Sequence, residues 1–576
     1  MNDNPIQTLP PQPAMRYKLV TNEKAGGATY TPKILADFVA DEITKLMEIH
    51  DRTAPLRILD PAVGDGELLS SLLARLPASE SVEIYGFDTN ENAVNATRDR
   101  LIRERPSAFL HIEAGDFLEF ALNQASPSIE PSLFAGNSFQ TFDLIIANPP
   151  YVRIQILGAE YAQLLAKQFG LAGRVDLYHA FILGISAVLS PHGVAGIIVS
   201  NRFMTTKAGA AVRKAVRRSL SLRHVWDFGD TKIFNAAVLP AVLLAAGRNG
   251  DCILESHFTS IYETHTPTNC ERGSIIDALQ VDGVVAIPDG RRFNVRHGLL
   301  NDSDIWRVAT DAGDEWLRAV DAHTWRTFGD VGKIRVGVKT CGDDVFIRKN
   351  WNGEVEAELL RPVLTHHIAA QFRADMAKSQ RQILYPHETC DGKRRAVDLA
   401  NYPHAASYLE RHRKTLEART YVLEAGRRWY EIWVPQDPDE WRRAKLVFRD
   451  IVEKPCFWLD LEGAVVNGDC YWMTCHRDQD EELLWLAVAV GNSKFIESFY
   501  DHRFNNKLYS GRRRFITQYV EKFPLPDPAS PFGKLIIQKA KTAYQTTAIG
   551  DRNRLAGEIS DLVWKAFGLP IEKIGG

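Results

Sequence analysis

The sequence predicts an α/β fold with a parallel sheet in its first half and a second domain of mixed α/β structure. Short apolar runs at 56–60, 82–88 and 142–147 are separated by stretches with helical periodicity, as in parallel strands joined by crossover helices. The chain has 576 residues, which is too long for one hydrophobic core, so two or three domains are expected.

The composition is that of a soluble globular protein, with 45% hydrophobic and 24% charged residues. The formal net charge of −3 means that any nucleic-acid surface must be local. Seven cysteines without a CxxC pair favour a reducing compartment. Cys470, Cys475 and His476 lack a second ligand pair, so no metal site is expected. With no apolar run of membrane-spanning length and no signal-peptide core, we expect a cytoplasmic protein without a membrane partner.

The N-terminal residues 1–25 are polar and proline-rich, which predicts a flexible lead. A helical pattern follows at 34–40. Thr31 is expected to be the N-cap of this helix, and Pro32 to occupy its first position.

The strand at 56–60 ends in Asp60 and leads into a glycine-containing loop at 61–66. Glycines at such a position let a bound molecule approach the backbone. The loop is not the GxGxxG dinucleotide fingerprint, and the carboxylates of Asp60, Asp65 and Glu67 favour a cationic ligand over a phosphate.

Two further strands also end in acidic residues. The strand at 82–88 ends in Asp88, about twenty residues beyond the loop, which suits an acceptor for ribose hydroxyls. A strand at 111–114 leads to Asp116. Each carboxylate alone is more often a helix cap or a solvated loop residue, but acids at three successive strand ends indicate a ligand site.

The apolar strand at 142–147 is followed by Asn148, Pro149, Pro150 and Tyr151. Open α/β sheets bind ligands at the carboxyl ends of their strands, and the two prolines stiffen the turn there. The Asn148 side-chain oxygen and the Pro149 carbonyl can both accept from a planar –NH2 group, while the Tyr151 ring covers its flat face. The alternative interpretation is an ordinary strand-ending turn.

With these motifs in this order, residues 24–250 resemble the catalytic domain of S-adenosylmethionine-dependent DNA adenine-N6 methyltransferases. The order of motifs is that of the γ class, the TaqI-like modification methylases, in which the recognition domain comes last. The resemblance implies a Rossmann-like class I methyltransferase domain over residues 26–250. The segment Arg174 to Phe181 resembles the family's next helix motif. Val63 and Asp65 stand where the family often has Cys and Ser.

The resemblance also assigns roles to individual positions. The positions that match the cofactor motifs are Tyr30, Thr31, Asp60, Ala62, Gly64, Gly66, Asp88, Asp116, Phe117 and Asn148. The positions that match the catalytic site are Asn148, Pro149, Pro150, Tyr151 and Phe234. Phe234 falls where the family places a second aromatic ring against the target base; the alternative is a core aromatic at the start of a strand.

The implied reaction is methyl transfer to N6 of an adenine that is flipped out of double-stranded DNA. Acceptors at Asn148 and Pro149 would stabilise the charge that develops on the amine, and no histidine or carboxylate base is needed. Residues 152–173, with Gly158, Gly170 and Gly173, are expected to form a loop that closes over the base.

In the second half, residues 251–320 are expected to form a connection with some strands. Residues 321–576 are expected to form a DNA target-recognition domain that opens with a hairpin at 332–347. Basic and aromatic residues are interleaved here, a pattern that suits phosphates and base edges. The candidate DNA-binding residues are Arg427, Arg428, Trp429, Tyr430, Lys507, Arg512 and Arg513. The alternative is that these are solvated helix faces.

Other functions remain open at this stage. The chain could be the modification subunit of a multisubunit restriction system, an RNA or protein-glutamine N-methyltransferase, or a catalytically silent DNA-binding regulator. No nuclease signature is evident, so a cognate restriction endonuclease would be a separate protein. By the resemblance we expect a nucleoid-associated prokaryotic protein that acts on DNA as a monomer.

Overall fold

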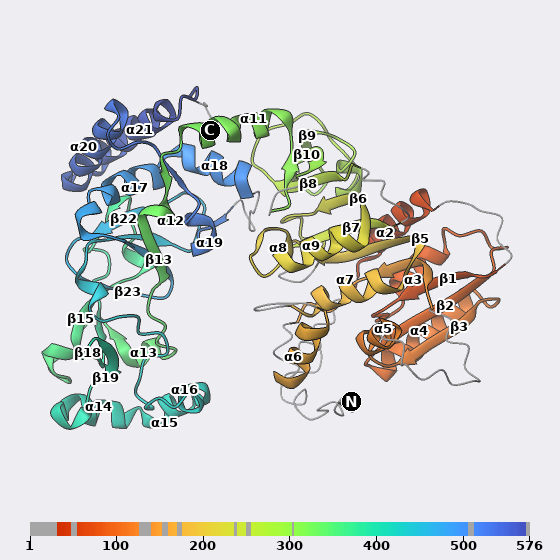
Figure 1. Ribbon diagram of the computed structural model, residues 1–576, viewed down its shortest axis with the longest axis horizontal. Helices are drawn as coiled ribbons and strands as arrows, with labels where there is room; N and C mark the ends of the chain where they lie inside the picture. Colours follow the sequence, from red (N-terminus) through yellow and green to blue (C-terminus); the bar gives the residue numbers. More distant parts are fainter. Residues whose placement is uncertain are drawn as a thin grey trace, which may run out of the picture. The chain divides into compact units, whose positions relative to one another are not determined.

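The computed structural model describes residues 31–47, 54–125, 140–152, 159–169, 176–234, 239–248, 255–301, 305–504 and 512–571. The chain divides into two compact units, residues 1–310 and 311–576 (Figure 1). Among the described residues, no helix is both long and apolar enough to cross a membrane. The expected N-terminal lead and the glycines of the expected closing loop lie outside these ranges.

The first unit is built on one sheet of 11 strands, in the order β11-β10-β8-β6-β7-β5-β4-β1-β2-β3, with β9 paired to β10. The predicted parallel sheet is confirmed: β1 to β5 are parallel, whereas β7 runs antiparallel to both β5 and β6. The strands are β1 (Leu56–Asp60), β2 (Val82–Asp88), β3 (Phe109–Ala114), β4 (Phe142–Ala147), β5 (Leu189–Ser200), β6 (Leu220–Asp227), β7 (Pro240–Gly247), β8 (His257–Glu263), β9 (Gly283–Ala286), β10 (Arg292–Leu300) and β11 (Val308–Ala309).

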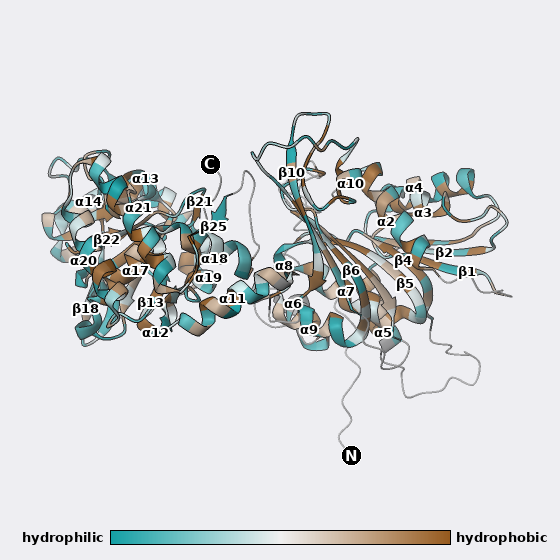
Figure 2. Cartoon of the chain, turned by 90° about the horizontal axis from the view of Figure 1, so that it is seen from above, coloured by the Kyte–Doolittle hydropathy of each residue, from teal (hydrophilic) through white to brown (hydrophobic). Residues whose placement is uncertain are grey.

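Helices cover both faces of this sheet, which is why its central strands are apolar almost throughout (Figure 2). The helices that share one core cluster are α2 (Lys33–Leu46), α3 (Glu67–Leu73), α4 (Glu91–Glu104) and α10 (Ile275–Ala278). Those that share the other are α5 (Phe117–Ala125), α7 (Leu177–Val188), α8 (Arg202–Thr205) and α9 (Ala210–Ser219). A further helix, α6, spans Ala159–Gln168.

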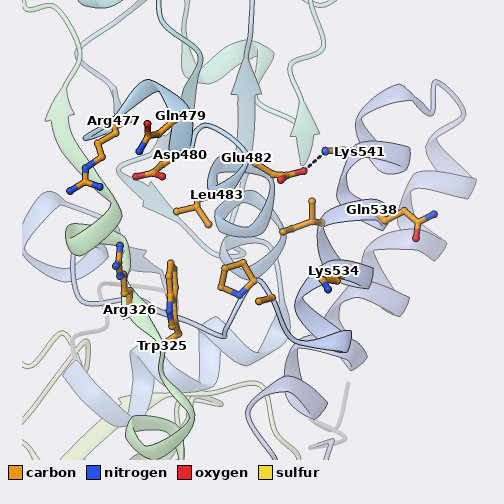
Figure 3. A pocket seen from close by; sticks show the side chains of 13 residues that line it. Trp325, Arg326, Arg477, Gln479, Asp480, Glu482, Leu483, Lys534, Gln538 and Lys541 are labelled. Atoms are coloured by element: carbon orange, nitrogen blue, oxygen red, sulfur yellow. Dashed lines mark hydrogen bonds and ion pairs between the residues drawn. The ribbon is translucent and has the colours of Figure 1, made fainter.

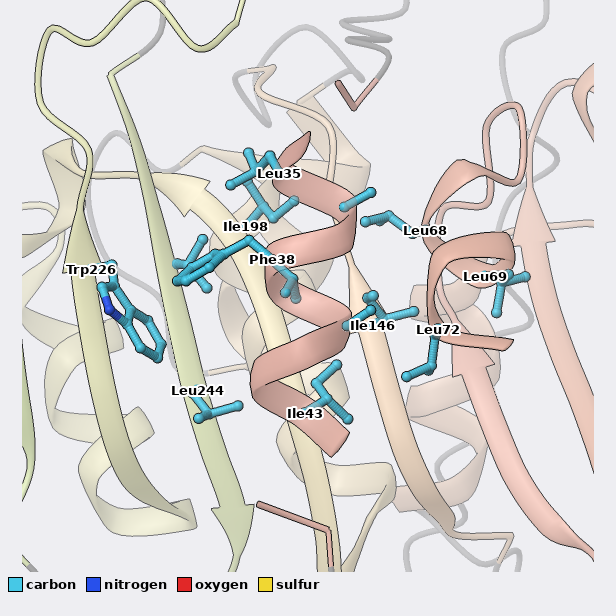
Figure 4. Close-up of a cluster of buried hydrophobic side chains, with 14 of the residues drawn as sticks. Leu35, Phe38, Ile43, Leu68, Leu69, Leu72, Ile146, Ile198, Trp226 and Leu244 are labelled. Carbon is cyan, nitrogen blue, oxygen red and sulfur yellow. The ribbon is translucent and has the colours of Figure 1, made fainter. Parts of the chain in front are cut away.

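Helix α2 lies close against the sheet. The Phe38 ring packs edge-on against Trp226 at a centroid distance of 5.1 Å, in a cluster that includes Ile146 and Ile198 (Figure 4). A Cβ atom at Gly196 of β5 would lie 2.6 Å from a methyl group of Val39, so only glycine permits this approach. The N-terminal helix is therefore fixed next to the carboxyl end of β4.

The region 251–320, which was expected to be a connection with some strands, contains strands that belong to the sheet of the first unit. Its strands β8 to β11 extend the first sheet, with β8 parallel to β6 and antiparallel to β10. The boundary between the units falls at Thr310, before α11 (Asp311–His323). Glycine-rich turns such as 288–291 look alike in a linker and between strands of one sheet, so the sequence alone did not assign these strands to the first sheet.

The second unit contains a five-stranded sheet, β13-β24-β20-β22-β16, and a four-stranded sheet, β14-β17-β15-β23. Its strands are β12 (Arg326–Thr327), β13 (Gly332–Val336), β14 (Ile347–Arg348), β15 (Leu360–Leu364), β16 (Phe372–Arg373), β17 (Gln382–Leu384), β18 (His387–Cys390), β19 (Lys393–Ala396), β20 (Lys445–Arg449), β21 (Ile451–Val452), β22 (Phe457–Asp460), β23 (Val465–Val466), β24 (Cys470–Cys475), β25 (Arg513–Arg514) and β26 (Pro524–Leu525). Its further helices are α12 (Phe328–Val331), α13 (Asp343–Phe346), α14 (Pro403–Arg411), α15 (Arg413–Glu417), α16 (Thr420–Glu424), α17 (Leu483–Gly491), α18 (Lys494–Phe504), α19 (Thr517–Val520), α20 (Pro531–Gln545) and α21 (Ile549–Ala566).

The hairpin predicted at 332–347 does not form. β13 pairs with β24, and β14 pairs with β17 in the other sheet. Between them, the backbone N–H of Gly342 donates to the Thr340 hydroxyl at 3.1 Å and the short helix α13 begins. Strand partners that are distant in sequence have therefore replaced the local pairing.

Candidate active site

The candidate site lies at the carboxyl ends of β1, β2 and β4. The chain places β2 on one side of β1 and β4 on the other, so a topological switch point lies between β1 and β4. Asp60 and Asp88 are the last residues of β1 and β2, and Asn148 directly follows β4. The residues that the sequence singled out thus belong to neighbouring strand ends.

Hydrogen bonds to Thr31 and Tyr151 hold the Asn148 side chain. Its amide nitrogen donates to the Thr31 hydroxyl at 2.9 Å, and its amide oxygen accepts from the Tyr151 hydroxyl at 2.8 Å. Thr31 is buried and does not cap α2, because Pro32 occupies the N-cap position without a side-chain cap. The prediction of Thr31 as the N-cap is therefore wrong. Tyr30 lies outside the described residues.

Tyr151 and the prolines form a stiff turn. Pro149 is buried and Pro150 is half-buried. The half-buried Tyr151 ring packs edge-on against Tyr178 of α7 at 5.9 Å, and burial raises the pKa of the Tyr151 phenol well above its ordinary value. The phenol is therefore protonated and donates to Asn148. The backbone N–H of Leu177 donates to the Val152 carbonyl at 2.7 Å, which ties the end of the turn to α7.

Asp60 is completely buried at the start of the glycine loop. One carboxylate oxygen accepts from the backbone N–H of Ala62 at 3.0 Å, and the other has no hydrogen-bond partner among the described residues. Burial raises the pKa of Asp60 to about 8, and the charges of Asp88 and Asp65 add to this effect. A cation next to this carboxyl group would restore its ionised form.

Asp88 and the glycine loop are joined directly. The Asp88 carboxylate accepts from the backbone N–H of Gly64 at 3.0 Å and from that of Asn90 at 2.9 Å. Gly64 and Gly66 have positive φ angles of 52° and 77°. No atom lies within 4 Å of the position that a Cβ of Gly64 would take, so the loop backbone is open on that side. An open, acidic loop of this kind fits a cationic ligand with hydroxyl groups.

Asp116 and Phe117 lie at the start of α5. The Asp116 carboxylate accepts from the backbone N–H of Leu118 at 2.8 Å. The Phe117 side chain is only 1% exposed and packs among aromatic rings that include Phe87 and Phe181. Packing is thus the role of Phe117 in this structure, and of this pair only the half-buried Asp116 has a polar side chain.

Phe234 is also buried, at 3% exposure, in the core cluster beneath α2. Stacking against a substrate would require its ring to leave this cluster. The core interpretation that the sequence left open is the one that this geometry supports.

Sequence reasoning missed a buried network at the end of β6. The Asp227 carboxylate accepts from the Tyr262 hydroxyl at 2.6 Å, from the Asn201 amide at 2.8 Å and from the backbone N–H of Gly229 at 3.0 Å. Burial raises the pKa of Asp227 to about 6. The network holds the first residues of the segment that leads to Phe234. The available signal was a carboxylate at the end of a strand, as for Asp60, but polar residues interrupt the apolar pattern of β6.

In the second unit, several candidate DNA-binding residues bind the protein itself. Arg427 donates to the Trp433 carbonyl at 2.5 Å, and Arg428 donates to the Tyr430 hydroxyl at 2.7 Å. Tyr430 is 5% exposed and donates to the Val397 carbonyl.

The remaining candidates of the second unit differ in exposure. Trp429 is half-buried, with the Arg413 guanidinium 5.2 Å from its ring centroid. Arg513 is paired with Asp501 at 2.8 Å, whereas its neighbour Arg512 is exposed. Lys507 lies outside the described residues.

A cavity of about 640 Å³ lies within the second unit (Figure 3). Both cations and acids line it, and the Lys541 ammonium is 2.6 Å from the Glu482 carboxylate. It contains none of the strand-end residues and is therefore not the candidate active site. Within the described ranges, no three His, Cys, Asp or Glu side chains converge in an arrangement that could hold a metal ion.

The parallel sheet with its switch-point acids and the Asn-Pro-Pro-Tyr turn define a class I methyltransferase. Residues 82–234 match the family model of the Eco57I restriction-modification methylase, and residues 393–525 match that of the TaqI-like C-terminal specificity domain. The chain is 34% identical over 575 residues to the type II methyltransferase M.BanIII of Aneurinibacillus aneurinilyticus, covering 96% of this chain and 98% of the relative. The chain belongs to the type II methyltransferases of restriction-modification systems, and its cofactor is S-adenosylmethionine.

Further similarities cover most of the chain. M.BstVI of Geobacillus stearothermophilus, a type II methyltransferase, is 24% identical over 88% of this chain and 90% of its own length. The chain also resembles the structure of the type IIL restriction-modification enzyme MmeI in complex with DNA. The two share 12% sequence identity and superpose with a TM-score of 0.56, covering 94% of this chain and 73% of that one. At this identity, the likeness to MmeI shows a shared fold alone.

Proposed function

We propose that the protein is a γ-class, site-specific DNA methyltransferase that transfers a methyl group from S-adenosylmethionine to N6 of adenine in double-stranded DNA. The observation that carries the proposal is the Asn148 amide, which is oriented by Thr31 and Tyr151 at the switch point and follows the strand next to the Asp60 loop. The specificity-domain match over residues 393–525 favours DNA over the RNA and protein substrates.

The residues of the glycine loop fit the cofactor. S-adenosylmethionine, when bound, supplies an electrophilic methyl group on a positively charged sulfur. Asp60, with a buried oxygen that lacks a partner among the described residues, suits that positive charge or the cofactor's ammonium group. Asp88 keeps lone pairs beyond those used by Gly64 and Asn90, so it can accept from ribose hydroxyls. Gly64 leaves the backbone open for close approach.

Asn148 and Pro149 act on the amine of the substrate. The lone pair of N6 is delocalised into the adenine ring, which makes it a poor nucleophile. An amide oxygen has two lone pairs, so Asn148 can accept from N6 while it accepts from Tyr151. With the Pro149 carbonyl as a second acceptor, the amine becomes pyramidal and the positive charge that develops on it is stabilised. With the cofactor bound, the bond from N6 to the methyl group would form as the sulfur–methyl bond breaks, and N6 would release its proton to water.

Adenine must leave the duplex to reach this turn, because N6 is enclosed between stacked base pairs. The half-buried Tyr151 ring offers a stacking surface next to Asn148, and unstacking is partly offset there. Closure of residues 152–173 over the base, and a stacking role for Phe234, remain part of the proposal as sequence-based expectations.

The second unit would select the DNA sequence, and the family's name supports a separate cognate restriction endonuclease as a partner. We propose that a monomer acts on nucleoid DNA in a prokaryotic cytoplasm. A modification subunit that borrows its specificity from another chain is disfavoured by the specificity-domain match.

The test is to express the protein in a host that lacks adenine methylation and to sequence its genomic DNA by a method that reports modified bases. We expect N6-methyladenine at one short motif, its loss with Asn148→Ala, and its retention with Asn95→Ala on the surface of α4. Absence of N6-methyladenine with a folded protein that binds S-adenosylmethionine would overturn the proposal.

A further inference from the structure

A small hairpin in the second unit stands apart from both of its larger sheets. Strands β18 and β19 pair only with each other among the described strands (Figure 1). Asp391 and Gly392 form the two-residue turn, with φ angles of 53° and 69°. Two positive φ angles are typical of the hairpin turn whose twist matches that of its strands. All residues from Asp391 to Arg395 are exposed.

The base of this hairpin is fixed in the core. His387 is 2% exposed, and its Nε2 accepts from the backbone N–H of Ile432 at 3.1 Å. Burial and the charges of Arg394 and Arg427 lower the pKa of His387 to about 3, so the ring is neutral and remains an acceptor. The Val397 carbonyl accepts from Tyr430, so the other strand is also held where it leaves the hairpin.

The exposed end carries three consecutive cations. Arg395 is directly opposite Glu388 and pairs with it at 2.7 Å. Neither Lys393 nor Arg394 has an ion-pair partner in the part of the chain that the structure describes. The Arg394 guanidinium donates once, to the Gln436 carbonyl at 3.2 Å, which leaves most of its donors for another partner.

We infer that the β18–β19 hairpin enters the major groove of DNA as a two-stranded ribbon, with Arg394 donating to a base edge and Lys393 contacting a phosphate. The inference rests on the proposed function, which supplies DNA as the substrate. A two-stranded ribbon fits the major groove, and a hairpin that is already ordered loses little entropy on insertion. Arg394 is oriented from behind by Gln436, as a bidentate contact to guanine requires, whereas Lys393 is a point charge next to the turn.

This assignment also explains the neighbouring basic segment. Tyr430 holds the base of the hairpin through the Val397 carbonyl, and Arg427 donates to the Trp433 carbonyl, next to Ile432, which bonds to His387. Tyr430 and Arg427 are thus engaged with the protein itself, whereas Lys393 and Arg394 of the hairpin are exposed.

The experiment measures binding of the full-length protein to a duplex with its own methylation site and to a duplex of random sequence, at several salt concentrations. The variants are Arg394→Ala and Lys393→Ala. Their matched controls are Arg554→Ala and Lys565→Ala on exposed positions of α21. Thermal unfolding checks that all four remain folded, which their exposure favours.

We expect Arg394→Ala to raise Kd for the specific site by about 10- to 100-fold and to change Kd for random DNA by less than about twofold. Lys393→Ala should weaken binding to both duplexes equally and reduce the slope of log Kd against log salt by about one. Controls should match the wild type.

Equal losses on both duplexes for Arg394→Ala would overturn its assignment as a base reader. Wild-type behaviour of both hairpin variants, in a protein whose wild type binds its site, would overturn the inference alone. A wild type that binds no DNA would overturn the proposed function and this inference with it.

Discussion

The two units treat their predicted functional residues in opposite ways. In the first unit, Asp60, Asp88 and Asn148 lie at neighbouring strand ends, and the first two retain acceptor capacity towards an open loop. In the second, Arg427 and Arg513 are turned inward to the protein's own carbonyls and carboxylates. A residue at the end of a parallel strand has its place set by the sheet, whereas an arginine with five donors can equally clamp the fold or bind a ligand.

The largest expected effect is a difference in thermal stability between alanine variants of the adjacent residues Arg512 and Arg513. Arg513 is 12% exposed and pairs with Asp501 and Glu497, so Arg513→Ala leaves two partly buried carboxylates without their cation. We expect a loss of about 3 kcal/mol of stability, and a Tm lowered by roughly 6–12 °C. Arg512→Ala, at an exposed position, should leave Tm unchanged. Calorimetry on both variants checks this. If Arg513→Ala instead leaves Tm unchanged and weakens DNA binding, Arg513 is a DNA-binding residue and not a structural one.

Asp88 tests the opposite expectation, that an acid in the first unit serves a ligand. Asp88→Ala removes a charged acceptor, which is worth about 1.5–3 kcal/mol for hydrogen bonds to charged groups. Kd for S-adenosylmethionine should therefore rise by about 10- to 100-fold. The control is Asp99→Ala, an exposed acid on α4. Titration calorimetry measures both, and equal affinities for the two variants would make Asp88 a purely structural residue.

Asp60 predicts a pH dependence. Its pKa of about 8 keeps the carboxyl group protonated near neutral pH in the ligand-free protein. Because a cation favours the ionised form, affinity for S-adenosylmethionine should rise by up to about tenfold per pH unit between pH 6.5 and 8, and then level off.

The Asp60 carboxyl group also makes the stability of the protein depend on pH. The unfolded carboxyl ionises near its ordinary pKa of 3.8, whereas the folded one ionises near 8, so Asp60 makes the protein less stable as pH rises through this window. Asp60→Asn should remove this part of the pH dependence of both affinity and Tm. Comparison with the wild type cancels the titration of other groups, and parallel pH profiles would refute the role of Asp60.

The apolar runs at 56–60, 82–88 and 142–147 are strands in the structure, and most of their residues are buried because helices cover both faces of the sheet. Long-range pairings were not predictable: β8 joins β6 in the first sheet, and β13 joins β24 in the second unit. Thr31 is a single residue whose role was likewise not predictable from its local sequence. Its local pattern is that of a helix cap, but a partner 117 residues away, Asn148, uses the hydroxyl instead.

The positions of the strand-end acids and Asn148 were predictable from the sequence, because a strand's end faces the ligand edge of the sheet. The positions of the Phe117 and Phe234 rings were not, since an aromatic residue at such an edge can point into the core, as both do here. Asp227 carried one usable signal, an acid at the end of a strand, but its partners Asn201 and Tyr262 come from two other strands or their ends.

The smallest expected effect concerns Thr31, whose hydroxyl fixes the orientation of the Asn148 amide. Thr31→Val keeps the branched shape and removes this bond, which is worth about 0.5–1.5 kcal/mol, so kcat should fall by about fivefold. Kd for S-adenosylmethionine should change by less than about twofold, because the loop acids are untouched. Thr31→Ser should restore kcat, and Thr44→Val on α2 is the matched control, since its hydroxyl bonds only within its own helix.

A loss of affinity with unchanged kcat would instead assign Thr31 to the cofactor, as the family resemblance implies for this position. If kcat falls in Thr31→Val and Thr31→Ser restores it, then a residue just before a helix contributes to the site, as the residues at the strand ends do. In that case the residue serves catalysis through Asn148, and its role is set by a tertiary contact that local sequence does not reveal.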